Sequence, residues 1–313
     1  MQRNLFLPEG SLIHTKRNTE TVSSFQNLSS AMENEEIIEG MAVLCDDKHN
    51  LIVDAGGKRG IIPYKEAALG IEEGSTREIA VISKVGKPVS CIVRGIDEHS
   101  EIPLLLSRVG AQRKALAFFM ETLIPGDIIP ARVTHLEPFG AFVDIGCGIT
   151  SLIGIENLSV SRISHPRDRV SVGDCVLAVI LGKDEEKGRV ALSHRELLGT
   201  WQENADRFKP GQTVCGVVRG VEDYGIFIEL LPNLSGLAEY RDDINVGSRV
   251  SVYIKSIVPE KMKIKLIIID SVEAEASAEK QKIEYFTKTN HISEWRYSPR
   301  ECTKKEIVTV FDK

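Results

Sequence analysis

The stretch EPFGAFVDIGCG, residues 137–148, returns in altered form as EDYGIFIELLPN, residues 222–233. Both copies have the order acidic residue, any residue, aromatic residue, Gly, any residue, Phe, apolar residue, acidic residue. The repetition is informative because only 6% of the residues are aromatic. Each copy follows a Pro-Gly pair and a short run rich in Val and Ile, a pattern that favours β-strands.

The sequence around these copies also repeats, in three blocks. Each block opens with an apolar strand, reaches a strand that ends in an acidic residue, and later has a Gly that opens a new strand. The acidic residues are Asp54, Asp144 and Glu229. The blocks recur about every 85 residues, which is too long for a solenoid repeat and suits a small barrel of about five strands.

We therefore predict a mostly β fold of three tandem five-stranded barrels, joined by short helical linkers and flanked by flexible tails. The first residues are rich in Ser, Thr and Asn, a composition typical of a disordered tail. Two segments of helical composition each stop at a Pro-Gly pair, which cannot continue a helix. The predicted divisions are a disordered tail at 1–39, a degenerate barrel at 40–108, a helical linker at 109–123, a barrel at 124–195, a helical linker at 196–209, a barrel at 210–270 and a partly helical tail at 271–313.

The bulk composition is that of an ordinary soluble protein, with 42% apolar and 27% charged residues. No stretch is long and apolar enough to span a bilayer, and the N-terminus lacks the apolar core of a signal peptide. Six scattered cysteines without a C-x-x-C pair argue against a zinc or disulfide framework and favour a cytoplasmic protein. The net charge of −6 argues against a polycation that grips duplex DNA, but not against a single-strand binder that stacks bases on aromatic rings.

The repeated phrase places two aromatic residues three positions apart: Phe139 and Phe142 in the first copy, Tyr224 and Phe227 in the second. On a regular strand such residues point to opposite faces. Because Gly permits a bulge or sharp bend, we expect Gly140 to bring both rings to the outer face, where bases can stack. The alternative is ordinary packing, with one ring in the core and one at the surface. The second copy keeps both rings and the Gly, which favours paired stacking platforms.

Basic residues accompany the predicted strands in three places. The loop VSRISHPRDRV carries Arg162 and His165, the hairpin GKDEEKGRV carries Arg189, and Lys263 lies in an alternating run of the third block. Positive charges at these places can bind the phosphates of a nucleic acid. A charged run is also the ordinary solvated face of a strand, and a His before a Pro can be a turn residue, so both interpretations stay open at this point.

With these residues in view, the second block resembles the RNA-binding domain of the ribosomal protein S1 family. The segments FGAFVDIG, NLS…RISHP, VGDCVLAVI and GRVALS match that domain in order. The linker WQENADRFKPGQTVCGVV is similar to the joint between tandem copies in that family. The resemblance covers about residues 40–270 and implies five-stranded OB-type barrels that bind single-stranded RNA.

The resemblance also implies which residues of the second block contact RNA. The family uses two strand aromatics, a His, and an Asp and an Arg near the last hairpin. Phe139 and Phe142 match the aromatics, and Asp184 and Arg189 match the Asp and the Arg. The family's His falls at Gly154, so one expected contact is missing.

The other two blocks depart further from the family's pattern. In the third block Tyr224 and Phe227 match the aromatics, Lys263 stands near the position of the Arg, and the RISHP-type loop is absent. The first block is degenerate, because His49 and Ile52 occupy its aromatic positions. We expect it to fold as a barrel and to bind RNA poorly, or to dock on protein as the leading repeats of that family are thought to do.

These features predict a binding protein and no enzyme. The expected partner is single-stranded RNA, chiefly messenger RNA in translation, bound by a small-subunit ribosomal protein or a ribosome-associated factor in the cytoplasm. The alternative is an adaptor that docks on a ribosome, polymerase or RNA-decay complex, with RNA binding secondary. No cofactor, metal or membrane partner is expected. The predicted RNA-binding residues are Phe139, Phe142, Arg162, His165, Asp184, Arg189, Tyr224, Phe227 and Lys263.

Overall fold

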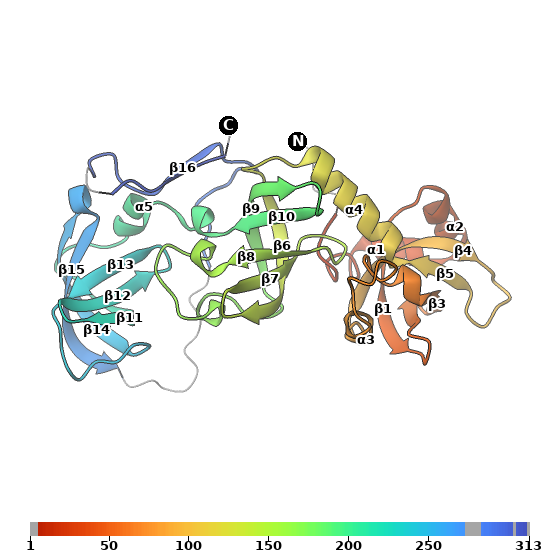
Figure 1. Ribbon diagram of the computed structural model, residues 1–313, viewed down its shortest axis with the longest axis horizontal. Helices are drawn as coiled ribbons and strands as arrows, with labels where there is room; N and C mark the ends of the chain where they lie inside the picture. The colour runs from red at the N-terminus through yellow and green to blue at the C-terminus, as the bar shows by residue number, and fades with distance from the viewer. Residues whose placement is uncertain (1–5, 273–282, 303–304, 312–313) are drawn as a thin grey trace.

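The computed structural model describes residues 6–272, 283–302 and 305–311. Within these residues, three closed five-stranded β-barrels follow one another in chain order along an elongated molecule (Figure 1). The predicted fold class, mostly β with three tandem five-stranded barrels, is confirmed. None of the described helices is long and apolar enough to cross a membrane.

The first barrel has five strands, with a 3₁₀ turn and a short helix between its third and fourth strands. These elements are β1 (Ile38–Cys45), β2 (Leu51–Ala55), β3 (Lys58–Ile62), η1 (Tyr64–Glu66), α3 (Ile79–Ile82), β4 (Pro88–Ile96) and β5 (Leu104–Ser107). The strand order around the barrel is β1-β2-β3-β5-β4. Parallel pairing of β3 with β5 closes the barrel, while the other neighbours are antiparallel.

The second barrel repeats this topology, with β8 and β10 as the parallel pair. Its connection between the third and fourth strands contains two 3₁₀ turns. The elements are β6 (Ile128–Glu137), β7 (Gly140–Asp144), β8 (Thr150–Gly154), η2 (Ile155–Asn157), η3 (Pro166–Asp168), β9 (Cys175–Asp184) and β10 (Arg189–Ser193).

The third barrel has the same strand order again, with β13 and β15 in parallel. Its connection between the third and fourth strands is short. The elements are β11 (Thr213–Glu222), β12 (Gly225–Leu231), β13 (Leu234–Ala238), β14 (Arg249–Val258), η5 (Pro259–Lys261) and β15 (Lys263–Val272).

Alternation along the strands fills each barrel and leaves the other face outside. On β12, Ile226, Ile228 and Leu230 are buried in the core, whereas Phe227 between them points outward. Successive side chains of a strand point to opposite faces, so the Val- and Ile-rich pattern of the sequence sets which residues form the core. The outward residues are then free to differ between the barrels.

The linkers between the barrels are helical, as the predicted fold class requires. The first is α4 (Arg108–Thr122), which the Ser107 hydroxyl caps by accepting a hydrogen bond from the Gly110 N–H. The second linker is shorter and consists of η4 (Arg195–Leu198) and α5 (Trp201–Ala205). Trp201 and Ala205 are buried in the core cluster of the third barrel, so this apolar face of α5 packs on that barrel.

The prediction of a disordered tail over residues 1–39 is wrong for the residues that the structure describes there. They form α1 (Lys16–Ser23) and α2 (Phe25–Glu33), and Val22, Leu28 and Ala31 are buried against the first barrel. The polar composition is misleading because several polar residues have structural roles. The hydroxyls of Thr15 and Ser24 cap the two helices.

The C-terminal segment is also ordered where the structure describes it. Its strands β16 (Glu294–Arg296) and β17 (Val308–Val310) pair antiparallel, and the segment runs along one edge of the second and third barrels (Figure 1). The predicted helical part of this tail falls mainly on residues 273–282, outside the described residues.

Candidate nucleic-acid interface

The two aromatic residues of the first copy lie together on the surface of the second barrel. Glu137 pairs with Gly140, so Phe139 occupies the two-residue turn between β6 and β7 while Phe142 lies on β7. The ring centroids are 5.9 Å apart, and the rings are inclined at 86°. Phe139 is 55% exposed and Phe142 is half-buried. We call Phe139 and Phe142 the second-barrel ring pair.

The second copy forms an equivalent pair on the third barrel. Tyr224 lies in the turn between β11 and β12, because Glu222 pairs with Gly225, and Phe227 follows on β12. The centroids are 6.1 Å apart at 87°, and the side chains are 70% and 36% exposed. We call Tyr224 and Phe227 the third-barrel ring pair. Both pairs therefore offer open ring faces to solvent, and neither lies inside its barrel.

The glycine of each phrase acts differently from the prediction. A Cβ at Gly140 would lie 2.5 Å from the Ile153 carbonyl oxygen, and a Cβ at Gly225 would lie 2.5 Å from the Ala238 carbonyl oxygen. The irregularity in the β6–β7 pairing lies between Val133 and His135, away from the phrase. Each glycine thus allows close approach of the neighbouring strand, and the hairpin turn, not a bulge at Gly140, turns the first ring outward.

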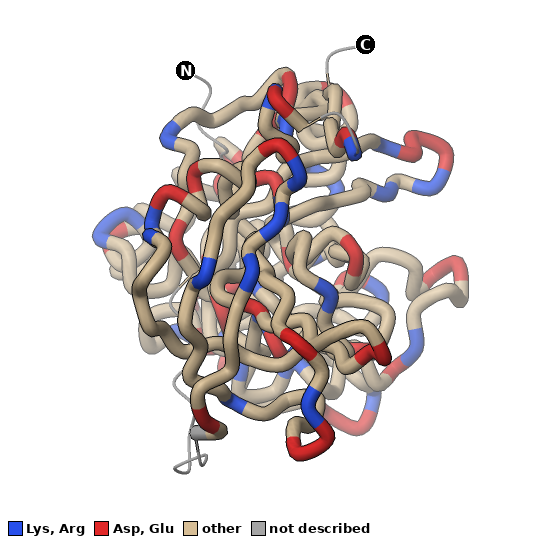
Figure 2. The backbone as a smooth tube through the Cα atoms, turned by 90° about the vertical axis from the view of Figure 1, so that its left-hand side faces the viewer, with Lys and Arg blue, Asp and Glu red and all other residues tan. Residues whose placement is uncertain are grey.

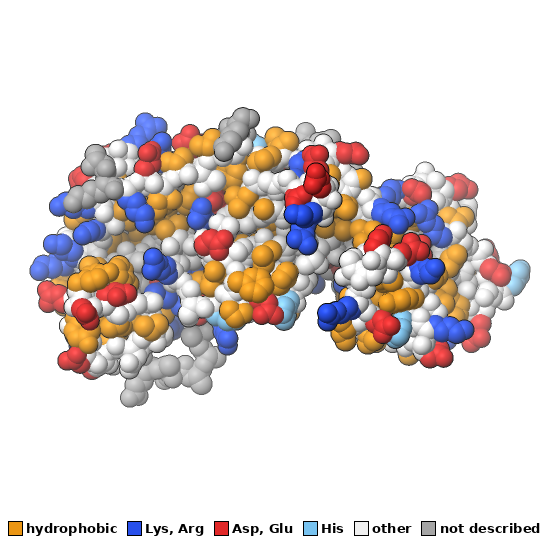
Figure 3. Space-filling view, in the orientation of Figure 1, with side chains coloured by type: hydrophobic (Ala, Val, Ile, Leu, Met, Phe, Trp, Pro, Cys, Tyr) orange, Lys and Arg blue, Asp and Glu red, His pale blue; other side chains and the backbone are white. Residues whose placement is uncertain are grey.

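A groove of about 810 Å³ opens on the second barrel beside its ring pair. Its walls come from β7, β8, η2, β9 and β10. The predicted residues Phe142, Asp184 and Arg189 all line this groove, as does Gly154, the position at which the family's His is missing. Hydrophobic side chains gather in patches over the second and third barrels on the face that Figure 3 shows.

Two predicted residues, Arg162 and His165, lie outside this groove. They belong to the connection between β8 and β9, none of whose residues from 158 to 174 lines the groove in the described structure. His165 caps η3: its Nδ1 accepts a hydrogen bond from the Arg167 N–H at 3.1 Å, and the Asp168 carboxylate accepts one from the His165 N–H. The turn interpretation of His165 therefore has a direct structural basis.

The same connection contacts the third barrel through residues that the sequence analysis did not single out. Arg169 and Glu229 form a buried bidentate ion pair, and Arg219 donates to the same carboxylate at 2.9 Å. Ser161 and Ser235 are joined at 2.8 Å between their hydroxyl oxygens. We call residues 158–169 the docking loop. No local sequence signal marks a pair of residues 60 positions apart as partners.

The register of the third barrel supports the equivalence of Lys263 with Arg189. Ala191 on β10 pairs with Leu152 on β8, and Lys265 on β15 pairs with Leu237 on β13. Arg189 and Lys263 each lie two residues before that pairing point, so they occupy matching outward positions. Lys263 is exposed. Figure 2, which looks at the end of the molecule formed by the third barrel, shows Lys and Arg recurring along neighbouring front strands.

The first barrel carries a different outer face at the same positions. Ile52 on β2 pairs with Ile61 on β3, which pairs with Leu105 on β5. This row is aliphatic, whereas the second barrel has Phe142 at the position of Ile52. Leu105 is 44% exposed. The first barrel therefore lacks the aromatic platform of the other two.

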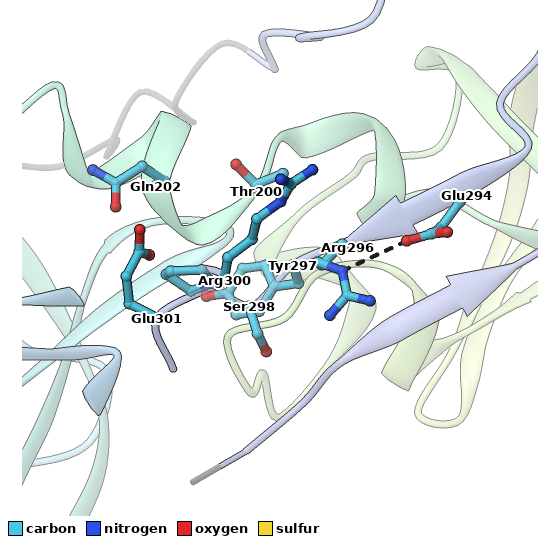
Figure 4. Close-up of a pocket in the computed structure, with 9 residues that line it drawn as sticks. Thr200, Gln202, Glu294, Arg296, Tyr297, Ser298, Arg300 and Glu301 are labelled. Atoms are coloured by element: carbon cyan, nitrogen blue, oxygen red, sulfur yellow. Dashed lines mark ion pairs between the residues drawn. The ribbon is translucent and has the colours of Figure 1, made fainter. Parts of the chain in front are cut away.

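A second hollow lies between α5 and the C-terminal segment, with a volume of about 400 Å³ (Figure 4). Two of its charged residues are paired with each other: Arg296 contacts Glu294 at 3.5 Å, and Arg296 also pairs with Glu306 outside the hollow. Tyr297 in its wall is buried, and its hydroxyl donates to the Asn233 carbonyl oxygen at 2.6 Å. The hollow therefore offers no open ring face, and its residues hold the C-terminal segment in place.

The junction between the first and second barrels contains a buried ionic cluster. Glu9 is paired with Arg108 and Lys84, each at 2.6 Å, and its N–H donates to Asp144 at 2.7 Å. Burial alone would raise the pKa of Glu9, but the two cations outweigh it and lower that pKa to about 2. Burial and the neighbouring Glu9 charge raise the pKa of Asp144 to about 6. Among the described residues, no cluster of His, Cys, Asp and Glu could hold a metal ion.

Comparison with known proteins agrees with this geometry. The family model of the S1 RNA binding domain matches residues 122–195, which span the second barrel. The resemblance to the S1 family that the sequence predicts is confirmed. The first and third barrels have the same strand topology as the second barrel.

Two relatives that align with most of this chain are named as ribosomal proteins. It is 32% identical over 269 residues to small ribosomal subunit protein bS1 of Leuconostoc lactis, covering 80% of this chain and 60% of that protein. It is 28% identical over 301 residues to the bS1 homolog of Bacillus subtilis, covering 94% and 76%. The solution structure of GSP13 from Bacillus subtilis is 32% identical over 24% of this chain and 57% of that one, with a TM-score of 0.23. The chain thus spans 60% of the length of the Leuconostoc relative.

Proposed function

We propose that this protein binds single-stranded RNA through the ring pairs of its second and third barrels. The observation that carries the proposal is the occurrence of two edge-to-face ring pairs on the surface, at the same hairpin of two barrels, with Phe142 half-buried and the other three rings exposed. On the second barrel the pair borders a groove that also contains Arg189 and Asp184. The S1-type domain over residues 122–195 supports RNA as the ligand.

Stacking supplies the main attraction in this proposal. A base on an aromatic ring contributes about 1–3 kcal/mol and tolerates any sequence. Few basic residues accompany the rings, which fits a protein with a net charge of −6. One barrel alone is therefore a weak binder, and the second engages the same strand at a high effective concentration because the barrels are joined by a short linker.

The decisive experiment removes the rings while the barrels stay folded. Replacing both rings of the second-barrel pair by Ala should weaken binding of a single-stranded oligonucleotide at least about tenfold, and removing both pairs about a hundredfold. Fluorescence anisotropy measures the affinity, and circular dichroism checks the fold. The matched control is I79A/I82A, which removes two exposed apolar side chains from the first barrel. Unchanged affinity after loss of both pairs would refute the proposal.

Two further measurements define the ligand. Duplex RNA should bind much more weakly than a single strand, because its bases are already stacked on each other. The slope of log affinity against log salt should be modest, roughly −0.7 for each phosphate neutralised. A steep slope together with insensitivity to the ring substitutions would indicate binding by charge instead of stacking.

The cellular role in this proposal is translation in the cytoplasm, with messenger RNA as the bound strand. The protein would act as a small-subunit ribosomal protein or a ribosome-associated factor, by binding alone and without a catalysed reaction or cofactor. The named relatives, which are small ribosomal subunit proteins, support this role. Sedimentation of a cell lysate tests it: co-migration with small subunits is expected, and a wholly free pool would contradict it.

The first barrel favours a second candidate, an adaptor that docks on a protein complex. Its outer row is aliphatic, and Val43, Leu44 and Ile79 are exposed on the same barrel. A pull-down with and without ribonuclease separates the candidates. Partners that survive digestion support the adaptor, and partners that are lost support RNA binding.

A further inference from the structure

The third barrel lacks a loop that the second barrel has. The connection from β8 to β9 spans residues 155–174, whereas the connection from β13 to β14 spans residues 239–248 only. From residue 158 to residue 174, the longer connection contributes nothing to the groove of its own barrel among the described residues. The docking loop, which is part of this connection, lies against the third barrel instead.

The docking loop covers part of the outer face of the third barrel. Arg169 reaches Glu229 on β12, with 2.9 Å between its Nη1 and the carboxylate Oε1. The Ser161 N–H donates to the Pro232 carbonyl at 3.1 Å, and the Ser161 hydroxyl contacts that of Ser235 on β13. Glu229 and Ser235 are cross-strand partners, so the loop sits on one continuous patch of this face.

This patch adjoins the third-barrel ring pair directly. Phe227 lies two residues before Glu229 on the same strand face, about 7 Å along the strand. Leu237 lies two residues after Ser235 and pairs with Phe227. The contacts of the docking loop at Glu229 and Ser235 therefore lie one residue row from Phe227 and its cross-strand partner Leu237.

The charges of the loop suit this position. The Glu229 carboxylate is neutralised by Arg169 and Arg219, and Arg219 also contacts Asp168 at 3.4 Å. Arg162 and Arg167 are exposed and remain as the outward positive charges of the loop. An exposed cation one or two residue rows from a stacked base is within reach of the phosphate that follows it.

We infer that the second and third barrels share a composite RNA site. Tyr224 and Phe227 stack bases, and Arg162 and Arg167 from the docking loop bind phosphates of the same strand. The inference rests on the proposed function and adds that the basic loop of the second barrel serves the third. The third barrel gains in this way the phosphate contacts that its own short connection cannot provide.

A double-mutant cycle in the full chain tests this pairing. R162Q/R167Q is introduced into the protein without the second-barrel ring pair and, separately, into the protein without the third-barrel ring pair. Affinity for a single-stranded oligonucleotide is measured by fluorescence anisotropy at low salt. The loop substitutions should weaken binding about fivefold where the third-barrel rings remain, and less than about twofold where they are absent.

A matched control separates the site from overall charge. K65Q/R77Q removes two exposed positive charges from the first barrel and should change neither affinity by more than about twofold. Because all four side chains are exposed, their loss should leave the unfolding temperature unchanged.

The outcomes distinguish this inference from the proposed function. If the wild-type protein does not bind RNA, the proposed function fails and the composite site with it. If RNA binds, the composite site is refuted by either of two results while RNA binding stands. In the first, the loop substitutions lower the RNA affinity of both ring-deleted proteins equally; in the second, they lower it only where the second-barrel rings remain. An equal loss from the control pair would also refute it, by showing a general charge effect.

Discussion

The acidic residue that ends the repeated phrase has a different partner in each copy. Asp144 accepts hydrogen bonds from the backbone N–H groups of Glu9, Gly146 and Gly148. Glu229 instead accepts from the guanidinium groups of Arg169 and Arg219. Both carboxylates are buried on the outer side of their barrels, two residues beyond the second ring of the phrase.

The difference shows that one sequence position can fix two unlike junctions. At Asp144, the N-terminal segment and the buried Glu9–Arg108 pair join the first and second barrels. At Glu229, a basic loop joins the second and third barrels next to the ring pair. We expect the first junction to affect stability alone and the second to affect both stability and RNA binding.

The largest effect is expected from breaking the second junction with E229Q. The neutral side chain leaves Arg169 buried without a counter-charge, which costs about 3–5 kcal/mol. The loosened docking loop should also lower RNA affinity when the third-barrel rings are the only pair present. Calorimetry and anisotropy measure the two effects, and a stability loss with unchanged affinity would show that the loop plays no part in binding.

Breaking the first junction with E9Q should give a smaller and purely structural effect. It removes the counter-charge of the buried Arg108 and of Lys84, at a cost of about 3 kcal/mol. The ring pairs are untouched, so RNA affinity should stay within about twofold of wild type. A marked loss of affinity in a folded E9Q protein would contradict the distinction between the two junctions.

Much of this architecture could be predicted from the sequence, because barrel cores are local patterns. The alternation around Ile226 and Ile228, and the repeated phrase with its rings, gave the three barrels and both ring pairs. Asp184 and Arg189 lie with Phe142 in one groove because the hairpin and the strand belong to the same barrel.

The junctions could not be predicted, because they depend on contacts between distant segments. Glu9 lies 99 residues from Arg108, and composition alone made its segment resemble a disordered tail. Arg169 was visible in the basic loop, but nothing in the sequence assigns it to Glu229. The same limit explains why Arg162 and His165 were grouped with the second barrel, whereas the fold carries their loop to the third.

The pH dependence of the first junction should follow Glu9 and Asp144. The pKa of Glu9 is lowered to about 2, so its stabilising contribution is complete above its ordinary value of 4.5 and is lost as pH falls toward 2. The pKa of Asp144 is raised to about 6, so its protonation stabilises the fold as pH falls from 7 toward 4. The unfolding temperature of wild type should therefore rise slightly from pH 7 to 5 and fall below 4.5.

The E9Q protein supplies the control for this profile. Without the Glu9 charge, the pKa of Asp144 should return toward its ordinary value, and the rise between pH 7 and 5 should shrink. The fall in unfolding temperature below pH 4.5 should also be smaller in E9Q. The unfolding temperatures of wild type and E9Q should therefore converge at low pH. Parallel curves across this range would show that other groups determine the pH dependence.

The smallest effect is expected at the matching acid of the first barrel, Asp54. It is exposed and accepts a hydrogen bond from the Gly57 N–H at 2.7 Å, within its own turn. D54N keeps an accepting oxygen, so the loss should be about 0.5 kcal/mol or less, measured by thermal unfolding. A loss of stability as large as that of E229Q would mean that the acidic residue of the repeated phrase stabilises the barrel itself. A small loss would instead support the view that the buried acids are retained for the junctions, because the exposed Asp54 side chain bonds only within its own turn among the described residues.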